Sequence, residues 1–109
     1  MKTITITIQD RDYILEIGQN QQENDNIIRN SQPRDLWFHL DNYSGPHFVL
    51  HTFGDPIPKR YLNYIGGLFP NYKNGLARRY SVIYTEIENV QMTNTPGTVI
   101  PHKTKKIKY

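Results

Sequence analysis

The sequence predicts one α+β domain, with helices packed on one side of a mixed or antiparallel sheet. Segments in which apolar and polar residues alternate recur along the chain, as is typical of strands. One further segment has apolar residues three and four positions apart, which is typical of a helix. A length of 109 residues suits a single domain, which we expect to span residues 1–109.

The first two predicted strands form a hairpin. Isoleucines alternate with threonines over residues 2–9, and Tyr13, Leu15 and Ile17 resume the alternation after a polar turn at residues 10–12. β-Branched residues at this period favour a half-buried strand. The amide-rich residues that follow are expected to form either a short helix or a flexible linker.

That amide-rich segment covers residues 19–31, and the pair Ile27 and Ile28 would anchor the short helix. Pro33 then ends any helix. Two more strands, at residues 34–40 and 47–53, are expected to pair across the intervening turn.

Alternation places Asp35, Trp37 and His39 on one face of the first of these strands. We expect Trp37 to lie in the core, because large aromatic side chains are mostly buried. The amphipathic helix is predicted between Asp55, as its N-cap, and Pro70, which ends it.

The last third of the chain predicts three more strands. They are expected at residues 78–87, 98–100 and 107–109, with Pro96 and Gly97 as a turn before the second. The sequence contains no cysteine, which excludes disulfides and thiolate metal sites. It has no signal-peptide pattern and no apolar run long enough to span a membrane, so we expect a cytoplasmic protein without a membrane partner.

Charge is distributed unevenly along the chain. Residues 1–55 carry 4 basic and 8 acidic side chains, a net charge of −4, whereas residues 56–109 carry 9 basic and 2 acidic ones, a net charge of +7. This asymmetry favours a polyanionic partner that contacts one continuous cationic surface. A solvated basic surface without a partner is the alternative.

Several motifs in order along the chain resemble a known family. Asp35, Trp37, His39, Gly45 and His47 resemble the Asp-x-Trp-x-His and Gly-x-His signature of the NFACT-R domain family. Other matches precede and follow this signature, and they extend the resemblance over about residues 17–109. The further matching residues are Asn24, Asp25, Ile27, Val82, Tyr84, Thr85, Val90, Pro96, Gly97, Val99, Lys105 and Ile107. Pro46 departs from the family, which usually has serine between the glycine and the histidine.

The resemblance implies an α+β RNA-binding domain and an RNA partner, tRNA or ribosomal RNA, in translation or ribosome-associated quality control. Lysines and arginines interleaved with tyrosines would add salt-dependent phosphate contacts and base stacking. We therefore expect a non-catalytic RNA-binding module without a cofactor. The residues expected to bind nucleic acid are Arg34, Asp35, Trp37, His39, His47, Lys59, Arg60, Lys73, Arg78, Arg79, Lys103, Lys105 and Lys106.

Four other interpretations stay open at the level of sequence. One is a domain that docks on a ribosome-associated complex through Tyr61, Tyr64 and Phe69, and another is a DNA-binding module. A zinc site would need the histidines near Asp35 to converge, but their spacing fits no known finger. A hydrolase would need Asp35 to orient His39 beside a serine, but no nucleophile-elbow motif is present.

Overall fold

The computed structural model describes all residues, 1–109, and its main feature is a six-stranded antiparallel sheet with strand order β1-β2-β4-β3-β5-β8. The strands of this sheet are β1 Lys2–Ile8, β2 Arg11–Ile17, β3 Leu36–Leu40, β4 Phe48–Leu50, β5 Ser81–Glu86 and β8 Lys105–Lys108. β6 Val90–Met92 and β7 Val99–Pro101 form a separate two-stranded sheet. The predicted α+β class and both predicted hairpins are confirmed.

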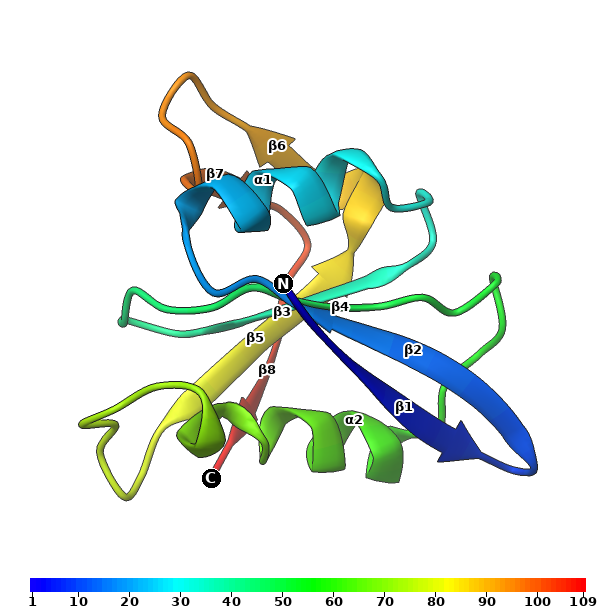
Figure 1. The fold of residues 1–109 in the computed structure, drawn as a ribbon. Coiled ribbons are helices and arrows are strands. Elements are labelled where there is room, and N and C mark those ends of the chain that lie inside the picture. The colour runs from blue at the N-terminus through cyan, green and yellow to red at the C-terminus, as the bar shows by residue number, and fades with distance from the viewer.

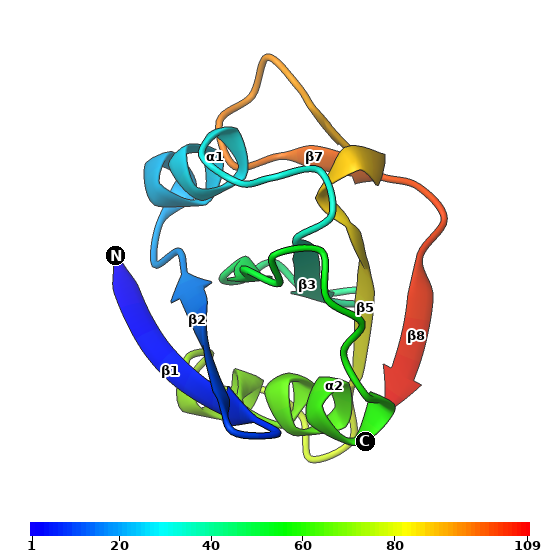
Figure 2. The same cartoon turned by 90° about the vertical axis from the view of Figure 1, so that its right-hand side faces the viewer.

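The two helices lie on opposite faces of the main sheet, not on one side as predicted (Figures 1 and 2). The helices are α1 Gln21–Arg29 and α2 Lys59–Gly66, and short 3-10 turns cover Phe69–Asn71 and Ile87–Asn89. β3 explains the difference, since Phe38 packs toward α2 while its neighbour Trp37 packs toward α1. A strand with large apolar residues on both faces needs a cover on each.

α1 is the short helix that the sequence left open. Its N-cap is Asn20, whose side chain accepts a hydrogen bond from the backbone N–H of Glu23. Ile27 and Ile28 anchor it in a small apolar cluster with Trp37. The two isoleucines provide the apolar contacts of a helix whose remaining residues are mostly polar.

The start of α2 differs from its prediction. Pro58 occupies the N-cap position, and no side chain caps the helix. Asp55 instead accepts hydrogen bonds from Arg11 and the Tyr13 hydroxyl, at 2.6 and 2.7 Å. The carboxylate therefore fastens the loop before α2 to the β1–β2 hairpin, where a charged donor is a stronger partner than a backbone N–H. Neither helix is long and apolar enough to cross a membrane.

The end of the chain packs against α2. The Tyr109 ring stacks on Tyr80 with 4.9 Å between ring centroids, and its hydroxyl donates to the Asn63 carbonyl at 2.6 Å. A Cβ at Gly66 would lie 2.1 Å from that hydroxyl, so only glycine leaves room for it. Burial and the neighbouring Tyr80 raise the pKa of Tyr109 to about 12, so its hydroxyl stays a donor at neutral pH.

Candidate nucleic-acid interface

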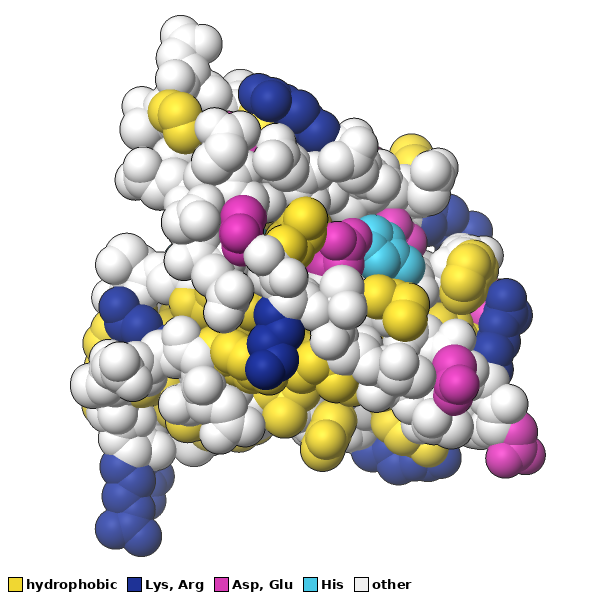
Figure 3. All heavy atoms as spheres, in the orientation of Figure 1, with side chains coloured by type: hydrophobic (Ala, Val, Ile, Leu, Met, Phe, Trp, Pro, Cys, Tyr) yellow, Lys and Arg dark blue, Asp and Glu magenta, His cyan; other side chains and the backbone are white.

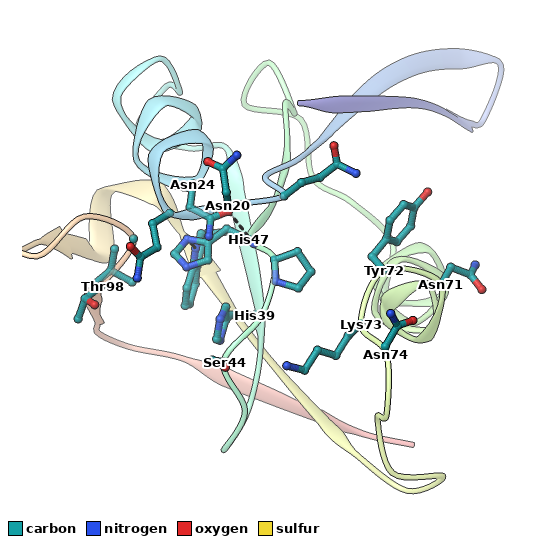
Figure 4. Close-up of a pocket in the computed structure, with 17 residues that line it drawn as sticks. Asn20, Asn24, His39, Ser44, His47, Asn71, Tyr72, Lys73, Asn74 and Thr98 are labelled. Carbon is teal, nitrogen blue, oxygen red and sulfur yellow. Dashed lines mark hydrogen bonds between the residues drawn. The ribbon is translucent and has the colours of Figure 1, made fainter.

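A pocket of about 920 Å³ lies where four segments that are distant in sequence meet. Its walls are the start of α1, the β3–β4 turn, the loop after the first 3-10 turn, and the start of β7 with the turn before it (Figure 4). We call it the four-segment pocket. The residues that line it are Gln19, Asn20, Gln21, Asn24, Trp37, His39, Ser44, Gly45, Pro46, His47, Asn71, Tyr72, Lys73, Asn74, Gly97, Thr98 and Val99.

Three aromatic rings from the family signature form one side of the four-segment pocket. The Trp37 and His39 rings are parallel, with centroids 5.6 Å apart, and the His47 ring stands edge-on to both. Trp37 and His47 are buried, with 1% and 2% of their surface exposed, whereas His39 is partly exposed. The predicted burial of Trp37 is confirmed, and His39 is the ring that a ligand can reach.

Burial favours the neutral form of both histidines that line the pocket. Burial, followed by the charge of nearby His39, lowers the pKa of His47 to about 3. Burial also lowers the pKa of His39, although the Leu40 and Gly45 carbonyls partly oppose this. The His39 Nδ1 lies 2.7 Å from the Leu40 carbonyl, so the Nδ1–H of the ring donates to it.

Buried polar side chains of α1 hold the walls together. Asn24 accepts a hydrogen bond from the backbone N–H of His47 at 3.2 Å, and Asp25 accepts one from the backbone N–H of Gly97 at 2.9 Å. Gly97 has a φ of +79°, and a Cβ there would lie 2.9 Å from Gln21. These contacts explain why an Asn-Asp pair and a Pro-Gly turn accompany the signature: both join the strands to α1.

Lys73 is the only cation in the four-segment pocket, and no carboxylate lines it. Its side chain points from the loop after the first 3-10 turn toward His39 (Figure 4). The Cδ atom lies 3.7 Å from where a Cβ of Gly45 would be, so the absent side chain leaves room for the lysine stem. An ammonium group beside neutral rings and amides attracts an anion.

Asp35 does not line the pocket, and it does not pair with His39 as the hydrolase alternative would need. Its buried carboxylate accepts hydrogen bonds from the backbone N–H groups of Gln32 and Thr52, and binds His51 Nδ1 at 2.8 Å. His51 is nearer because β4 runs antiparallel to β3. A contact between Asp35 and RNA stays a prediction. In the structure the carboxylate joins β3 to the residues that follow β4.

The other expected cations are spread over the surface. Arg34, Lys103 and Lys105 line a second hollow of about 420 Å³, and Arg60 lines a third of about 330 Å³ with Tyr61 and Tyr64. The remaining cations are exposed: Lys59 opens α2, Arg78 and Arg79 precede β5, and Lys106 pairs with Asp41 at 2.8 Å. Basic side chains stand apart on the face in Figure 3, unlike the one continuous surface that the charge count favoured.

Phe69 cannot serve the docking surface considered from sequence, because its side chain is fully buried against Phe48. The polar residues of the pocket that sequence reasoning missed lie mostly in its loops: Gln19, Asn20, Gln21, Ser44, Asn71, Tyr72, Asn74 and Thr98. Only the Asn-Asp and Pro-Gly motifs pointed to two of these segments. Nothing in the sequence indicated that residues 71–74 would meet them.

The sequence model of a protein family, the NFACT protein RNA binding domain, matches residues 2–108 of the chain. The chain belongs to this family. Coiled-coil domain-containing protein 25 of Danio rerio is 28% identical over 104 residues, and its homolog in Dictyostelium discoideum is 29% identical over 109. These matches cover 88% and 92% of the chain but 50% and 52% of the relatives, so the chain spans about half of their length.

A solved structure confirms the fold of this NFACT RNA-binding domain. The C-terminal part of the fibronectin/fibrinogen-binding protein from Streptococcus suis aligns with a TM-score of 0.81 at 20% sequence identity. The alignment covers 99% of the chain and 45% of the other chain. The family signature residues Trp37, His39 and His47 thus sit in a pocket on a fold that a distant protein shares.

Proposed function

We propose that this chain binds structured RNA in the cytoplasm, with tRNA or ribosomal RNA as the partner, in translation or ribosome-associated quality control. The observation that carries the proposal is the four-segment pocket, which brings Lys73 together with the signature rings of an RNA-binding family. Its lining of neutral amides, imidazoles and one lysine suits an RNA strand better than a cationic or apolar ligand.

The scattered cations favour a folded RNA over a short single strand. A folded RNA presents phosphates in several directions, so separate hollows can each contact some of them. Lys103 and Lys105 would form a second phosphate contact, in a hollow outside the four-segment pocket where Arg34 pairs with Glu86 at 3.8 Å. Because each neutralised phosphate releases counterions, affinity should fall steeply as salt rises.

The test compares two charge reversals in tRNA binding at several salt concentrations. Lys73→Glu changes the pocket, whereas Lys59→Glu makes the same charge change on the exposed first turn of α2. We expect Lys73→Glu to weaken binding about tenfold or more and to reduce the salt slope by about one, because it removes a phosphate contact. Lys59→Glu should have a smaller effect.

Absence of tRNA and ribosomal RNA binding at low salt would refute the proposal. Equal competition by duplex DNA would instead favour the DNA-binding alternative, because only RNA offers 2′-hydroxyls and A-form shape.

A further inference from the structure

We propose that the four-segment pocket holds a single unpaired nucleotide of the RNA, with its base stacked on His39 and its phosphate on Lys73. This inference rests on the proposed function and makes it more specific. The pocket would bind a flipped-out or loop nucleotide, and the exposed lysines and arginines would contact the paired regions of the RNA.

The stacking geometry supports a base at this position. Trp37 covers one side of the His39 ring in a parallel arrangement, and His47 supports both rings from the edge. His39 is partly exposed and lines the pocket, so its ring can receive a further aromatic ring from the pocket side. Unpaired bases stack on aromatic side chains, including histidine, whereas paired bases are already stacked within a helix.

The polar lining supports recognition of the base edge. The primary amides of Gln19, Gln21 and Asn74 and the hydroxyl of Thr98 line the pocket. A primary amide carries both donors and an acceptor, as does the edge of a nucleobase.

Size and charge agree with one nucleotide. The volume of about 920 Å³ lies within the range of small-molecule sites and exceeds what a single ring needs. Lys73 supplies one positive charge on the opposite side from α1, and no carboxylate opposes an incoming phosphate. The Asn24–His47 and Asp25–Gly97 hydrogen bonds join three of the four walls, so the side of the pocket that carries the signature rings exists before a ligand arrives.

The experiment uses two RNA hairpins that differ at one bulged position. One hairpin carries an adenine there and the other carries an abasic site, so their phosphates are the same. We expect wild-type protein to bind the adenine hairpin about tenfold more tightly, the typical loss when one stacking contact is removed. The fluorescence of a 2-aminopurine placed at the bulge should be quenched on binding, because the base would stack on the His39 ring.

Variants assign the preference to the pocket. His39→Ala should bind both hairpins equally, and His39→Phe should keep the preference because it keeps the ring. His102→Ala, a change at an exposed histidine outside the pocket, should leave the preference intact. Lys73→Gln should weaken the binding of both hairpins by the same factor, because it removes the phosphate contact and not the stacking contact.

Equal binding of both hairpins by wild-type protein, with salt dependence intact, would overturn this inference and leave the proposed function standing. A preference that survives in His39→Ala would also overturn it. Displacement of the hairpin by free adenosine monophosphate at equal affinity would reassign the pocket to a free nucleotide. If neither hairpin nor tRNA bound at low salt, the proposed function itself would fail.

Discussion

The indole Nε1 of Trp37 donates a hydrogen bond to Nδ1 of His47 over 3.2 Å, and both side chains are almost fully buried. Since the accepting nitrogen carries no proton, the neutral His47 ring has its proton on Nε2. A single contact between two signature residues therefore fixes the tautomer of His47 and satisfies the indole N–H. It also joins β3 to the start of β4 at the base of the four-segment pocket.

The first prediction concerns acid stability. The pKa of His47 is lowered to about 3 in the folded protein, because burial and the charge of His39 disfavour the imidazolium. Below about pH 6.5 the unfolded chain binds a proton that the folded chain does not, so this contribution to stability is present above pH 6.5 and lost toward pH 3. Urea unfolding at a series of pH values should show a steeper acid loss in wild-type protein than in His47→Gln.

His102→Gln is the matched control for that measurement, because His102 is exposed. Its acid profile should follow that of the wild type. If His47→Gln lost stability with the same slope as the wild type, protonation of His47 would not be the cause.

The second prediction concerns stability above neutral pH. His51 Nδ1 binds Asp35 at 2.8 Å, and Nε2 binds Glu16. Burial alone would lower the pKa of His51, but the hydrogen bonds and charges of the two carboxylates outweigh it and raise the pKa. The stabilisation is therefore complete below about pH 6.5 and is lost as pH rises through the raised pKa.

Glu16→Gln tests this, because it removes one carboxylate and keeps the shape. We expect the variant to be about 1.5 kcal/mol less stable near pH 6, the typical value of a charged hydrogen bond, and to show a flatter pH profile above it. NMR titration of the His51 imidazole should give a lower pKa in the variant. An unchanged imidazole pKa would rule out this account of the cluster.

The third prediction concerns Gly18. A Cβ on Gly18 would lie 2.0 Å from Asn24 Oδ1, the atom that accepts the hydrogen bond from the His47 backbone. Gly18→Ala should therefore displace Asn24 and cost about 1–3 kcal/mol of unfolding free energy. Gly45→Ala is the comparison, since a Cβ there meets Leu40 at 3.4 Å. Equal stability of the two variants in urea unfolding would contradict the packing at Gly18.

The strands of the main sheet could be predicted because alternation is a local signal. Isoleucines and threonines alternate in β1, and the predicted pairing with β2 is confirmed. The turn is at Gln9 and Asp10, not at residues 10–12 as predicted, since Arg11 and Asp12 already pair with β1. The placement of the helices could not be predicted in the same way. α1 is mostly polar, and its place on the face opposite α2 depends on contacts with residues distant in sequence, such as Trp37 and His47.

The candidate site shows the same division. Trp37, His39 and His47 stood out because they match the family signature. Lys73 was expected to bind nucleic acid only as one of many cations, since no pattern relates its loop to β3. In the small sheet, β7 was predicted but β6 was not, because the three residues around Gln91 are too few to show an alternating pattern.

The construction of the four-segment pocket has a practical consequence for mapping experiments. Its walls come from stretches near residues 20, 45, 73 and 98, so the pocket draws on most of the length of the chain. Any nested set of deletions would remove at least one wall and the hydrogen bonds that hold its neighbours. Loss of binding in a truncated fragment would thus report collapse of the pocket, and only point substitutions in the intact chain can locate the contacts.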